Sequence, residues 1–125
     1  MYLIFDTSIL IDLERENKRT IHLISEIKKS YLIPPKITFI TYCEFLHGIR
    51  KRSPENKAQA EAFLGLFEML VLTKKTATCL SQLKSKYGLD LADLLIASQV
   101  FESNAILVTK DKDFEKITEI EKIFI

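Results

Sequence analysis

The chain has 125 residues, of which 47% are hydrophobic and 28% are charged, and its formal net charge at pH 7 is +1. These values fit one globular domain over residues 1–125, and with only three glycines and three prolines they argue against a disordered chain or a loop-rich β fold. No apolar run approaches the roughly 20 residues of a membrane-spanning helix, and no basic segment precedes an apolar one at the N-terminus, so we expect a cytoplasmic protein without a signal peptide or membrane partner.

The first twelve residues predict a buried strand that delivers one carboxylate to the start of a helix. Residues 2–5 form an apolar run without alternation, which is typical of a central parallel strand that helices cover on both faces. Asp6, Thr7 and Ser8 then offer three good N-cap residues before apolar residues at helical spacing. Asp6 is therefore expected at the C-terminal end of a strand, the edge at which open α/β sheets build their sites.

Strand and helix patterns alternate along the rest of the chain. Further helices are expected over about residues 21–29, 41–52, 53–66, 73–87 and 91–102. Strands are expected at residues 37–40, 69–72 and 105–109, with a helical turn after Asp111 and an edge strand over residues 123–125. This alternation predicts an α/β fold of three layers, α/β/α, with a central parallel sheet of four to five strands.

Five acids stand out because they follow predicted strands or lie in the first turns of predicted helices: Asp6, Glu44, Asp93, Asp111 and Asp113. Each also has a purely structural interpretation. Thr41 and Glu44 fit a capping box. N-cap or first-turn positions suit the others, with Asp90 as the N-cap ahead of Asp93. The two interpretations are compatible, because a helix N-terminus also keeps a nearby carboxylate ionised.

Capping does not explain the apolar surroundings of Asp93, which lies in the run Leu91–Ala97. An acid there is expected to be buried or half-buried, which is costly unless a cation pairs with it, and no Lys or Arg is near in the sequence. Carboxylates without His or Cys form a hard-oxygen set that suits Mg²⁺ or Mn²⁺ rather than Zn²⁺. Glu44 and His47 have the spacing of di-iron bundles, but such a site needs that motif twice, so His47 is interpreted as a surface or packing residue.

Four short segments spread over almost the whole chain carry a resemblance: Phe5–Ser8 with Leu10 and Ile11, Ile40–Thr41 with Glu44 and Gly48, Asp93–Ala97, and Leu107–Phe114. In this order and in a chain of this length, they resemble the PIN-domain ribonucleases, in particular the VapC-type toxins of type II toxin–antitoxin pairs. The resemblance implies the strand order 3-2-1-4-5, which places the ends of the first and fourth strands side by side. Ala92 departs from the pattern, since many family members carry Asn before the third acid.

The functional positions of the family fall on residues already singled out. The resemblance implies four catalytic acids, Asp6, Glu44, Asp93 and Asp111, and the metal ligands Asp6, Asp93, Asp111 and Asp113, with Asp113 as an auxiliary or alternative fourth acid. Thr7 and Thr109 fall where members place small hydroxyl residues that line the site. Glu44 is then a ligand, a ligand through water, or the group that orients the attacking water, and the sequence does not choose among these roles.

The activity that the resemblance implies is Mg²⁺-dependent hydrolysis of RNA phosphodiester bonds, with Mn²⁺ as a substitute, by a toxin that a cognate antitoxin protein inhibits. It also implies a homodimer. Lys110 and Lys112 bracket Asp111, so we expect them to contact RNA phosphates. The alternatives are a nuclease of RNA processing without an antitoxin, and a non-catalytic binding domain on the same fold.

Overall fold

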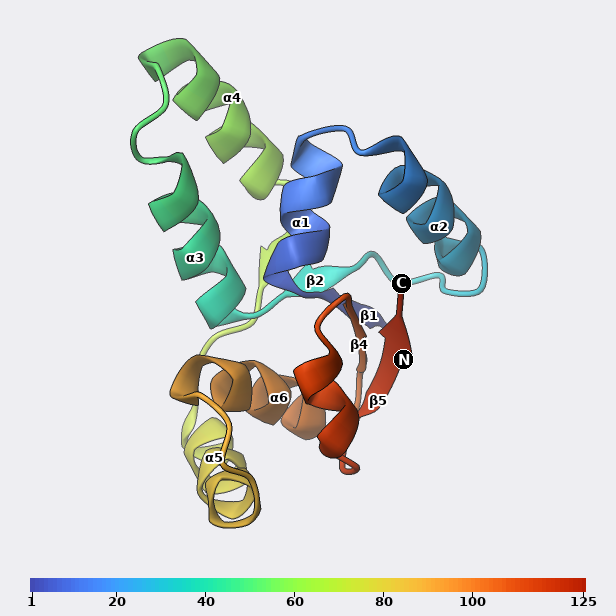
Figure 1. Ribbon diagram of the computed structural model, residues 1–125, viewed down its shortest axis with the longest axis vertical. Helices are drawn as coiled ribbons and strands as arrows, with labels where there is room; N and C mark the ends of the chain where they lie inside the picture. The colour runs from blue at the N-terminus through green and yellow to red at the C-terminus, as the bar shows by residue number, and fades with distance from the viewer.

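In the computed structural model, which describes residues 1–125, helices cover both faces of one parallel sheet (Figure 1). The five strands lie in the order β3-β2-β1-β4-β5, and every neighbouring pair is parallel. Both the predicted α/β class and the strand order 3-2-1-4-5 are confirmed. The bounds of the strands are Leu3–Phe5 (β1), Lys36–Ile37 (β2), Glu68–Met69 (β3), Ile106–Thr109 (β4) and Glu121–Phe124 (β5).

Six α-helices and one 3₁₀ helix connect the strands. In the view of Figure 1, α1 to α4 lie above the sheet, whereas α5, α6 and the 3₁₀ helix η1 lie below it. None of the helices combines the length and the apolar composition that crossing a membrane requires. The helices span Thr7–Glu14 (α1), Lys18–Lys28 (α2), Phe39–Ile49 (α3), Pro54–Leu64 (α4), Lys74–Lys86 (α5), Leu91–Ser103 (α6) and Lys112–Lys116 (η1).

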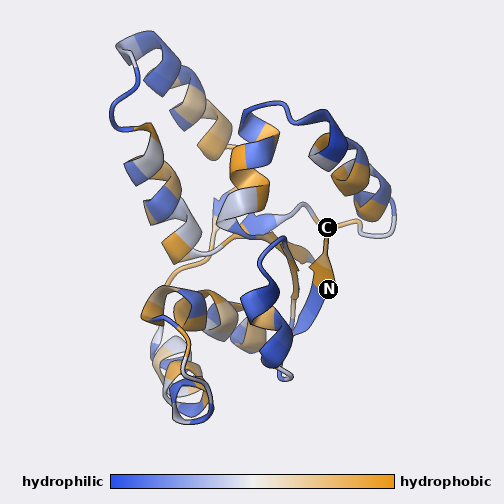
Figure 2. Ribbon diagram, viewed as in Figure 1, coloured by the Kyte–Doolittle hydropathy of each residue, from blue (hydrophilic) through white to orange (hydrophobic).

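The sheet separates two hydrophobic clusters, because successive side chains of a strand point to opposite faces. Leu3 and Phe5 of β1 belong to one cluster with Phe45 of α3, whereas Ile4 between them belongs to the other with Leu94 of α6. All five side chains are fully or almost fully buried. Figure 2 shows hydrophobic residues along the strands and on the sides of the helices that meet them. β1 is therefore buried on both faces, as its apolar run predicts.

The strands β2 and β3 are shorter than predicted, and the buried side chain of Gln99, on α6, contacts the chain just beyond both of them. The strands expected at residues 37–40 and 69–72 contain only two residues each. The amide oxygen of Gln99 accepts a hydrogen bond from the backbone N–H of Phe39 (2.9 Å), and its nitrogen donates to the carbonyls of Leu70 (3.1 Å) and Val71 (3.3 Å). One side chain thus satisfies backbone groups that a longer ladder would pair.

Helix α3 begins two residues earlier than predicted, because Thr38 rather than Thr41 is its N-cap. The side chain of Thr38 accepts a hydrogen bond from the N–H of Thr41 (3.2 Å). The capping-box interpretation of Thr41 and Glu44 is therefore wrong: Thr41 is buried within the first turn, and Glu44 contacts another side chain. Asp90 occupies the N-cap position of α6, as expected, but its side chain makes no capping hydrogen bond.

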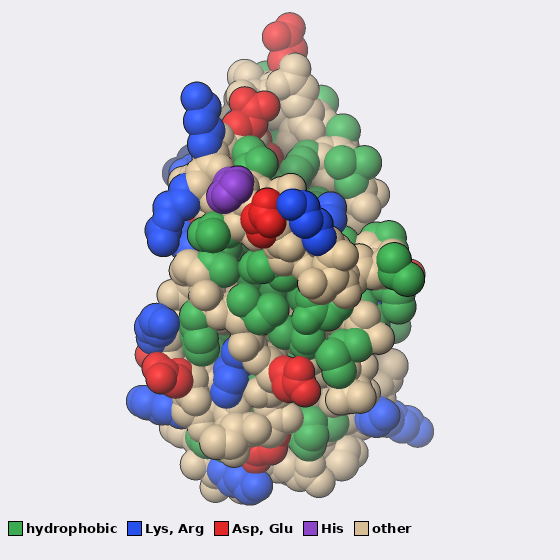
Figure 3. Space-filling model, turned by 90° about the vertical axis from the view of Figure 1, so that its right-hand side faces the viewer, with side chains coloured by type: hydrophobic (Ala, Val, Ile, Leu, Met, Phe, Trp, Pro, Cys, Tyr) green, Lys and Arg blue, Asp and Glu red, His purple; other side chains and the backbone are tan.

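Hydrophobic side chains also reach the surface. On the face that carries α2 and β5, Figure 3 shows them gathered between charged side chains. Leu32 and Ile33, which follow α2, are exposed. A separate apolar cleft of about 560 Å³ lies between α1, α2 and the end of α4, where Leu13, Ile24 and Phe63 line it.

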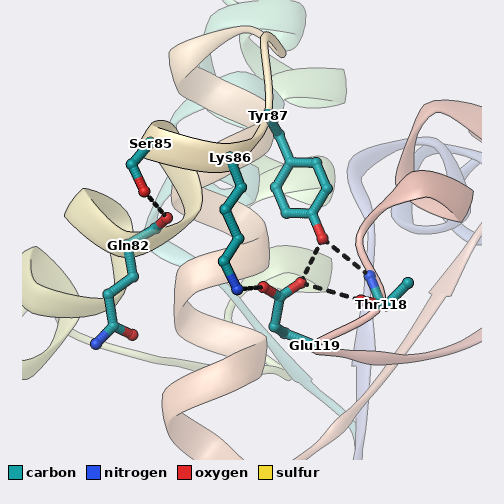
Figure 4. A network of polar contacts seen from close by, with 6 residues as sticks. All are labelled: Gln82, Ser85, Lys86, Tyr87, Thr118 and Glu119. Atoms are coloured by element: carbon teal, nitrogen blue, oxygen red, sulfur yellow. Dashed lines mark hydrogen bonds and ion pairs between the residues drawn. The ribbon is translucent and has the colours of Figure 1, made fainter.

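A polar network ties the end of α5 to the segment between η1 and β5 (Figure 4). The carboxylate of Glu119 accepts hydrogen bonds from the Tyr87 hydroxyl (2.6 Å) and the Lys86 ammonium group (2.9 Å). Both bonds lower the pKa of Glu119, to about 2, and the bond from Tyr87 has the larger effect. The network fixes the chain just ahead of β5, which begins at Glu121, two residues before its predicted start.

Candidate metal centre

The acids gather because β1 and β4 are parallel neighbours, so that their carboxyl ends meet at one edge of the sheet. Asp6 follows β1 directly, and Asp111 follows β4 after one residue. Asp93, in the first turn of α6, and Asp113, in η1, complete the group. Carboxylate oxygens of Asp93, Asp111 and Asp113 lie within 4.8 Å of one another, which is close enough for them to share one metal ion.

Asp6 is held by hydrogen bonds at both of its carboxylate oxygens. Oδ1 accepts from the backbone N–H of Thr7 (2.8 Å), and Oδ2 accepts from the buried hydroxyl of Thr109 (2.6 Å). The same hydroxyl oxygen accepts a hydrogen bond from the N–H of Asp111 (3.0 Å). The Thr109 side chain therefore links two acids of the centre and fixes their relative position.

Burial raises the pKa of Asp6, whose exposed fraction is 6%, and the charges of Glu44 and Asp111 raise it further. The hydrogen bonds from Thr109 and Thr7 oppose this effect by stabilising the carboxylate. The net shift of the pKa is upward, so the ionised form of Asp6 is under-stabilised by the protein alone. A cation at the centre would supply the missing stabilisation.

Glu44 joins the centre from α3 through Thr7. The Thr7 hydroxyl donates a hydrogen bond to Glu44 Oε1 (2.6 Å), and its oxygen lies 3.0 Å from the hydroxyl oxygen of Thr41. Glu44 itself is exposed. The two threonines thus orient one oxygen of Glu44, while the other oxygen has no hydrogen-bond donor within the protein.

The four acids predicted to be catalytic line one open cleft of about 460 Å³: Asp6, Glu44, Asp93 and Asp111. Thr7 lines the same cleft. Asp113 does not, although its carboxylate lies beside those of Asp93 and Asp111. Thr109 is fully buried and contacts Asp6 from outside the cleft lining.

Among these acids, Asp93 has the most strongly raised pKa. Burial comes first among the causes that raise its pKa to about 6, followed by the charges of Asp111, Asp6, Asp90 and Asp113. None of the five ion pairs in the protein includes an acid of the centre. An all-oxygen, partly buried and uncompensated set of carboxylates fits Mg²⁺ or Mn²⁺.

The two lysines that bracket Asp111 contact other groups. The Lys110 ammonium group pairs with Asp12 Oδ2 (2.6 Å), which also accepts a hydrogen bond from the Thr20 hydroxyl (2.7 Å). The Lys112 ammonium group lies 4.4 Å from the centre of the Phe124 ring.

The structure adds residues to the cleft that sequence reasoning did not select. Ser8, Ile11, His47 and Ile96 line it as well. His47 is exposed, as a surface residue should be, but residues three apart on a helix are neighbours, so it shares a face with Glu44. That spacing is the signal in the sequence that places His47 beside the acids. The Ser8 hydroxyl oxygen is buried and has no hydrogen-bond partner.

Comparisons with known proteins agree with this fold. The family model that describes the PIN domain matches residues 3–120. Comparison with curated proteins by sequence finds no significant match.

Among solved structures, the chain is similar to several toxin–antitoxin proteins. In VapBC2 from Rickettsia felis bound to a promoter DNA fragment, the matched chain has a TM-score of 0.86 at 21% identity, over 100% of this chain and 99% of that one. For the chain matched in DNA-bound VapBC from Salmonella typhimurium, the TM-score is 0.83 and the identity 23%, over 99% of this chain and 98% of that one. For the chain matched in VapBC-1 from nontypeable Haemophilus influenzae, the TM-score is 0.80 and the identity 24%, over 99% of this chain and 98% of that one. At these identities the likeness concerns the fold.

Proposed function

This chain belongs to the PIN-domain family, and from that premise we propose that it is a Mg²⁺-dependent endoribonuclease, the toxin of a VapBC-type toxin–antitoxin pair. The observation that carries the proposal is the cleft in which four carboxylates converge without a cationic partner: Asp6, Glu44, Asp93 and Asp111. A binding domain would have no use for this arrangement, because the repulsion among the acids costs stability.

Asp6, Asp93 and Asp111 are the residues that would hold the metal, with Asp113 as a further ligand or an alternative to Asp111. The chemistry that a bound Mg²⁺ supplies at such a centre is neutralisation of phosphate charge and a lower pKa for a water molecule. Thr109 and Thr7 hold the oxygens of Asp6 in place, so that no reorientation is needed when the substrate arrives.

Glu44 is the residue best placed to orient the attacking water. Its Oε1 is fixed by Thr7, and its second oxygen is free to accept a hydrogen bond from water. A carboxylate in this position can also accept the proton that the water loses as it attacks.

The toxin role adds a cognate antitoxin protein and a second copy of the chain as proposed partners. The relatives named above were crystallised as toxin–antitoxin complexes, which supports the first of these. The apolar cleft between α1, α2 and α4 offers a place where apolar side chains of such a partner could pack.

The experiment that tests the nuclease is cleavage of a structured RNA by purified protein with Mg²⁺, with Mn²⁺ and with EDTA. We expect cuts that require the metal and that are lost in Asp93→Asn and Asp6→Ala variants of unchanged secondary structure. Full activity in either variant would contradict the site assignment. A folded wild-type protein that neither cuts RNA nor binds Mn²⁺ would contradict the enzyme and favour the binding domain.

A further inference from the structure

The acidic cleft continues into a second region along the contact between α1 and α3. It shares Ile11 and Gly48 with a small cavity of about 30 Å³. That cavity in turn shares Arg15 and Arg52 with an open, wholly polar cavity of about 470 Å³. The three cavities are separate but share lining residues, and we call the row that they form the seam; it begins at the carboxylates and ends at two arginines.

The seam follows directly from helical spacing. On α1, Thr7, Ile11 and Arg15 are four residues apart and therefore lie on one face. Arg15, the C-cap of α1, stands about 12 Å along the helix from Thr7, given the rise of about 1.5 Å per residue. Glu44 and Gly48 have the same spacing on α3, and Arg52 follows that helix. On both helices the series thus starts in the acidic cleft, at Thr7 or Glu44, and ends at an arginine.

The residues that line the far cavity carry two positive charges, on Arg15 and Arg52, and one negative charge, on Glu14. Arg52 pairs with Glu14 (2.8 Å) and donates a hydrogen bond to Asn56 (3.1 Å), which fixes its guanidinium group. Arg15 is exposed and takes part in no ion pair. Two guanidinium groups against one carboxylate leave capacity for an anion, and a guanidinium group matches the geometry of a phosphate.

Gly48 keeps the middle of the seam open. A Cβ atom at this position would meet nothing within 4 Å, and no glycine in the chain has a positive φ, so neither packing nor backbone conformation requires glycine here. Glycine in a helix interior is also unfavourable relative to alanine. Its contribution is the space that it leaves between the acids and the arginines.

We propose that one single-stranded segment of the RNA substrate runs from the acidic cleft along this seam, over Gly48, with its phosphates bound by Arg15 and Arg52. The inference rests on the proposed nuclease for what happens at the acids, but it concerns a separate binding region. An extended polyanion fits because the seam begins at the cleft in which the phosphodiester is cut, and because its far end is positive.

The test of the charges is fluorescence anisotropy with a labelled single-stranded RNA of twelve nucleotides and mixed sequence, in EDTA so that no metal-dependent cleavage occurs. Arg15→Gln should weaken binding about tenfold, as expected for one charged hydrogen bond. It should also reduce the slope of log K against log salt concentration by about 0.7, the value for one phosphate contact on a single strand. Lys84→Gln, an exposed lysine of α5 away from the seam, is the matched control and should change neither quantity.

Substitutions at Gly48 test whether the open space at this position is needed for RNA binding. Gly48→Leu should reduce RNA binding at least as much as Arg15→Gln, while the thermal midpoint stays equal to or above that of the wild type because helix propensity improves. Gly48→Ala should raise the midpoint similarly and reduce binding less. Wild-type binding by Gly48→Leu together with an unchanged salt slope in Arg15→Gln would overturn the proposal.

The design separates this inference from the nuclease. Protein that binds RNA through Arg15 but cuts nothing with Mg²⁺ or Mn²⁺ would contradict the nuclease and support the seam. Protein that cuts RNA equally well in the Arg15→Gln and Gly48→Leu variants would support the nuclease and overturn the seam. Arg15-dependent binding of an oligoglutamate peptide, without Arg15-dependent binding of RNA, would also overturn it in favour of an acidic protein partner.

Discussion

Asp93 makes one pH-dependent contribution to the stability of the metal-free protein. Its folded pKa of about 6 lies above the ordinary value of 3.8, so between these values the folded state holds more protons than the unfolded state. The contribution of Asp93 to stability therefore falls as the pH rises through this window, and this loss is complete well above pH 6. Two pKa units correspond to about 3 kcal/mol, of which solvent screening removes a part.

Replacing Asp93 by Asn should therefore stabilise the metal-free protein by about 1–3 kcal/mol at pH 7.5 and change little at pH 4. Urea denaturation in EDTA at the two pH values measures this difference. Glu61→Gln is the matched control, because Glu61 is an exposed acid of α4 that takes part in no ion pair and does not act on Asp93. A clear loss of stability in Asp93→Asn would instead assign Asp93 a capping role.

Thr109 fixes the positions of Asp6 and Asp111 in the absence of metal. The Thr109→Val variant keeps the shape of the side chain and removes its hydroxyl. The variant should lose about 1–3 kcal/mol of stability, because Asp6 and the Asp111 N–H each lose a buried hydrogen bond. It should also bind Mn²⁺ about tenfold more weakly, as measured by calorimetric titration. Thr78→Val, on exposed α5, is the control. Unchanged Mn²⁺ affinity would show that Thr109 serves the fold alone.

At the scale of the elements, Gln99 of α6 links the segment that follows β3 to the start of α3. Gln99→Leu should cost about 1–3 kcal/mol of stability, because one backbone N–H and two carbonyls, all partly buried, lose their hydrogen-bond partner. Denaturant unfolding measures the cost, with Gln82→Leu on the exposed side of α5 as the control. A cost below 0.5 kcal/mol would mean that water or the strands themselves replace these bonds.

Gln99 also illustrates what the sequence could and could not predict. Apolar runs and capping residues located every strand and helix, because those signals are local. The ends of β2 and β3 could not be predicted, since the chain just beyond them contacts a side chain that is 60 residues from Phe39 and 29 residues from Leu70. The start of α3 was misplaced for a related reason, because Thr38 and Thr41 are both good N-cap residues and the choice between them depends on packing.

The candidate site also has features that local sequence signals predict and features that they do not. Asp6 and Asp111 could be selected because each follows an apolar strand, and Asp93 because its neighbours are apolar. The strand order that unites them came from the family resemblance rather than from any local pattern. Lys110 was expected at a phosphate, but the sequence contains no signal for its contact with Asp12, which lies 98 residues away.

For the whole molecule, metal binding should stabilise the fold, because only the folded chain brings the acids together. At 100 times its dissociation constant, Mn²⁺ should add about 2.7 kcal/mol and raise the thermal midpoint by about 8–10 °C. Differential scanning fluorimetry over a Mn²⁺ series measures this shift.

The same measurement distinguishes Asp111 from Asp113, between which the sequence leaves the fourth acid open. Asp111 lines the cleft and Asp113 does not, so Asp111→Asn should abolish the shift and Asp113→Asn should only reduce it. Equal loss in both variants would make them equivalent ligands. A full shift in Asp111→Asn would transfer the role to Asp113.

The hydrogen bond from Thr109 to Asp6 joins residues 103 positions apart, and β1 pairs with β4 across almost the same distance along the chain. On a ribosome, β1 emerges long before β4, its partner on one side. A nascent chain therefore carries Asp6 without the threonine that orients it and without Asp111. If the acids form the catalytic centre of a toxin, the order of synthesis delays its activity, since no chain can assemble that centre before β4 and Asp111 have been translated.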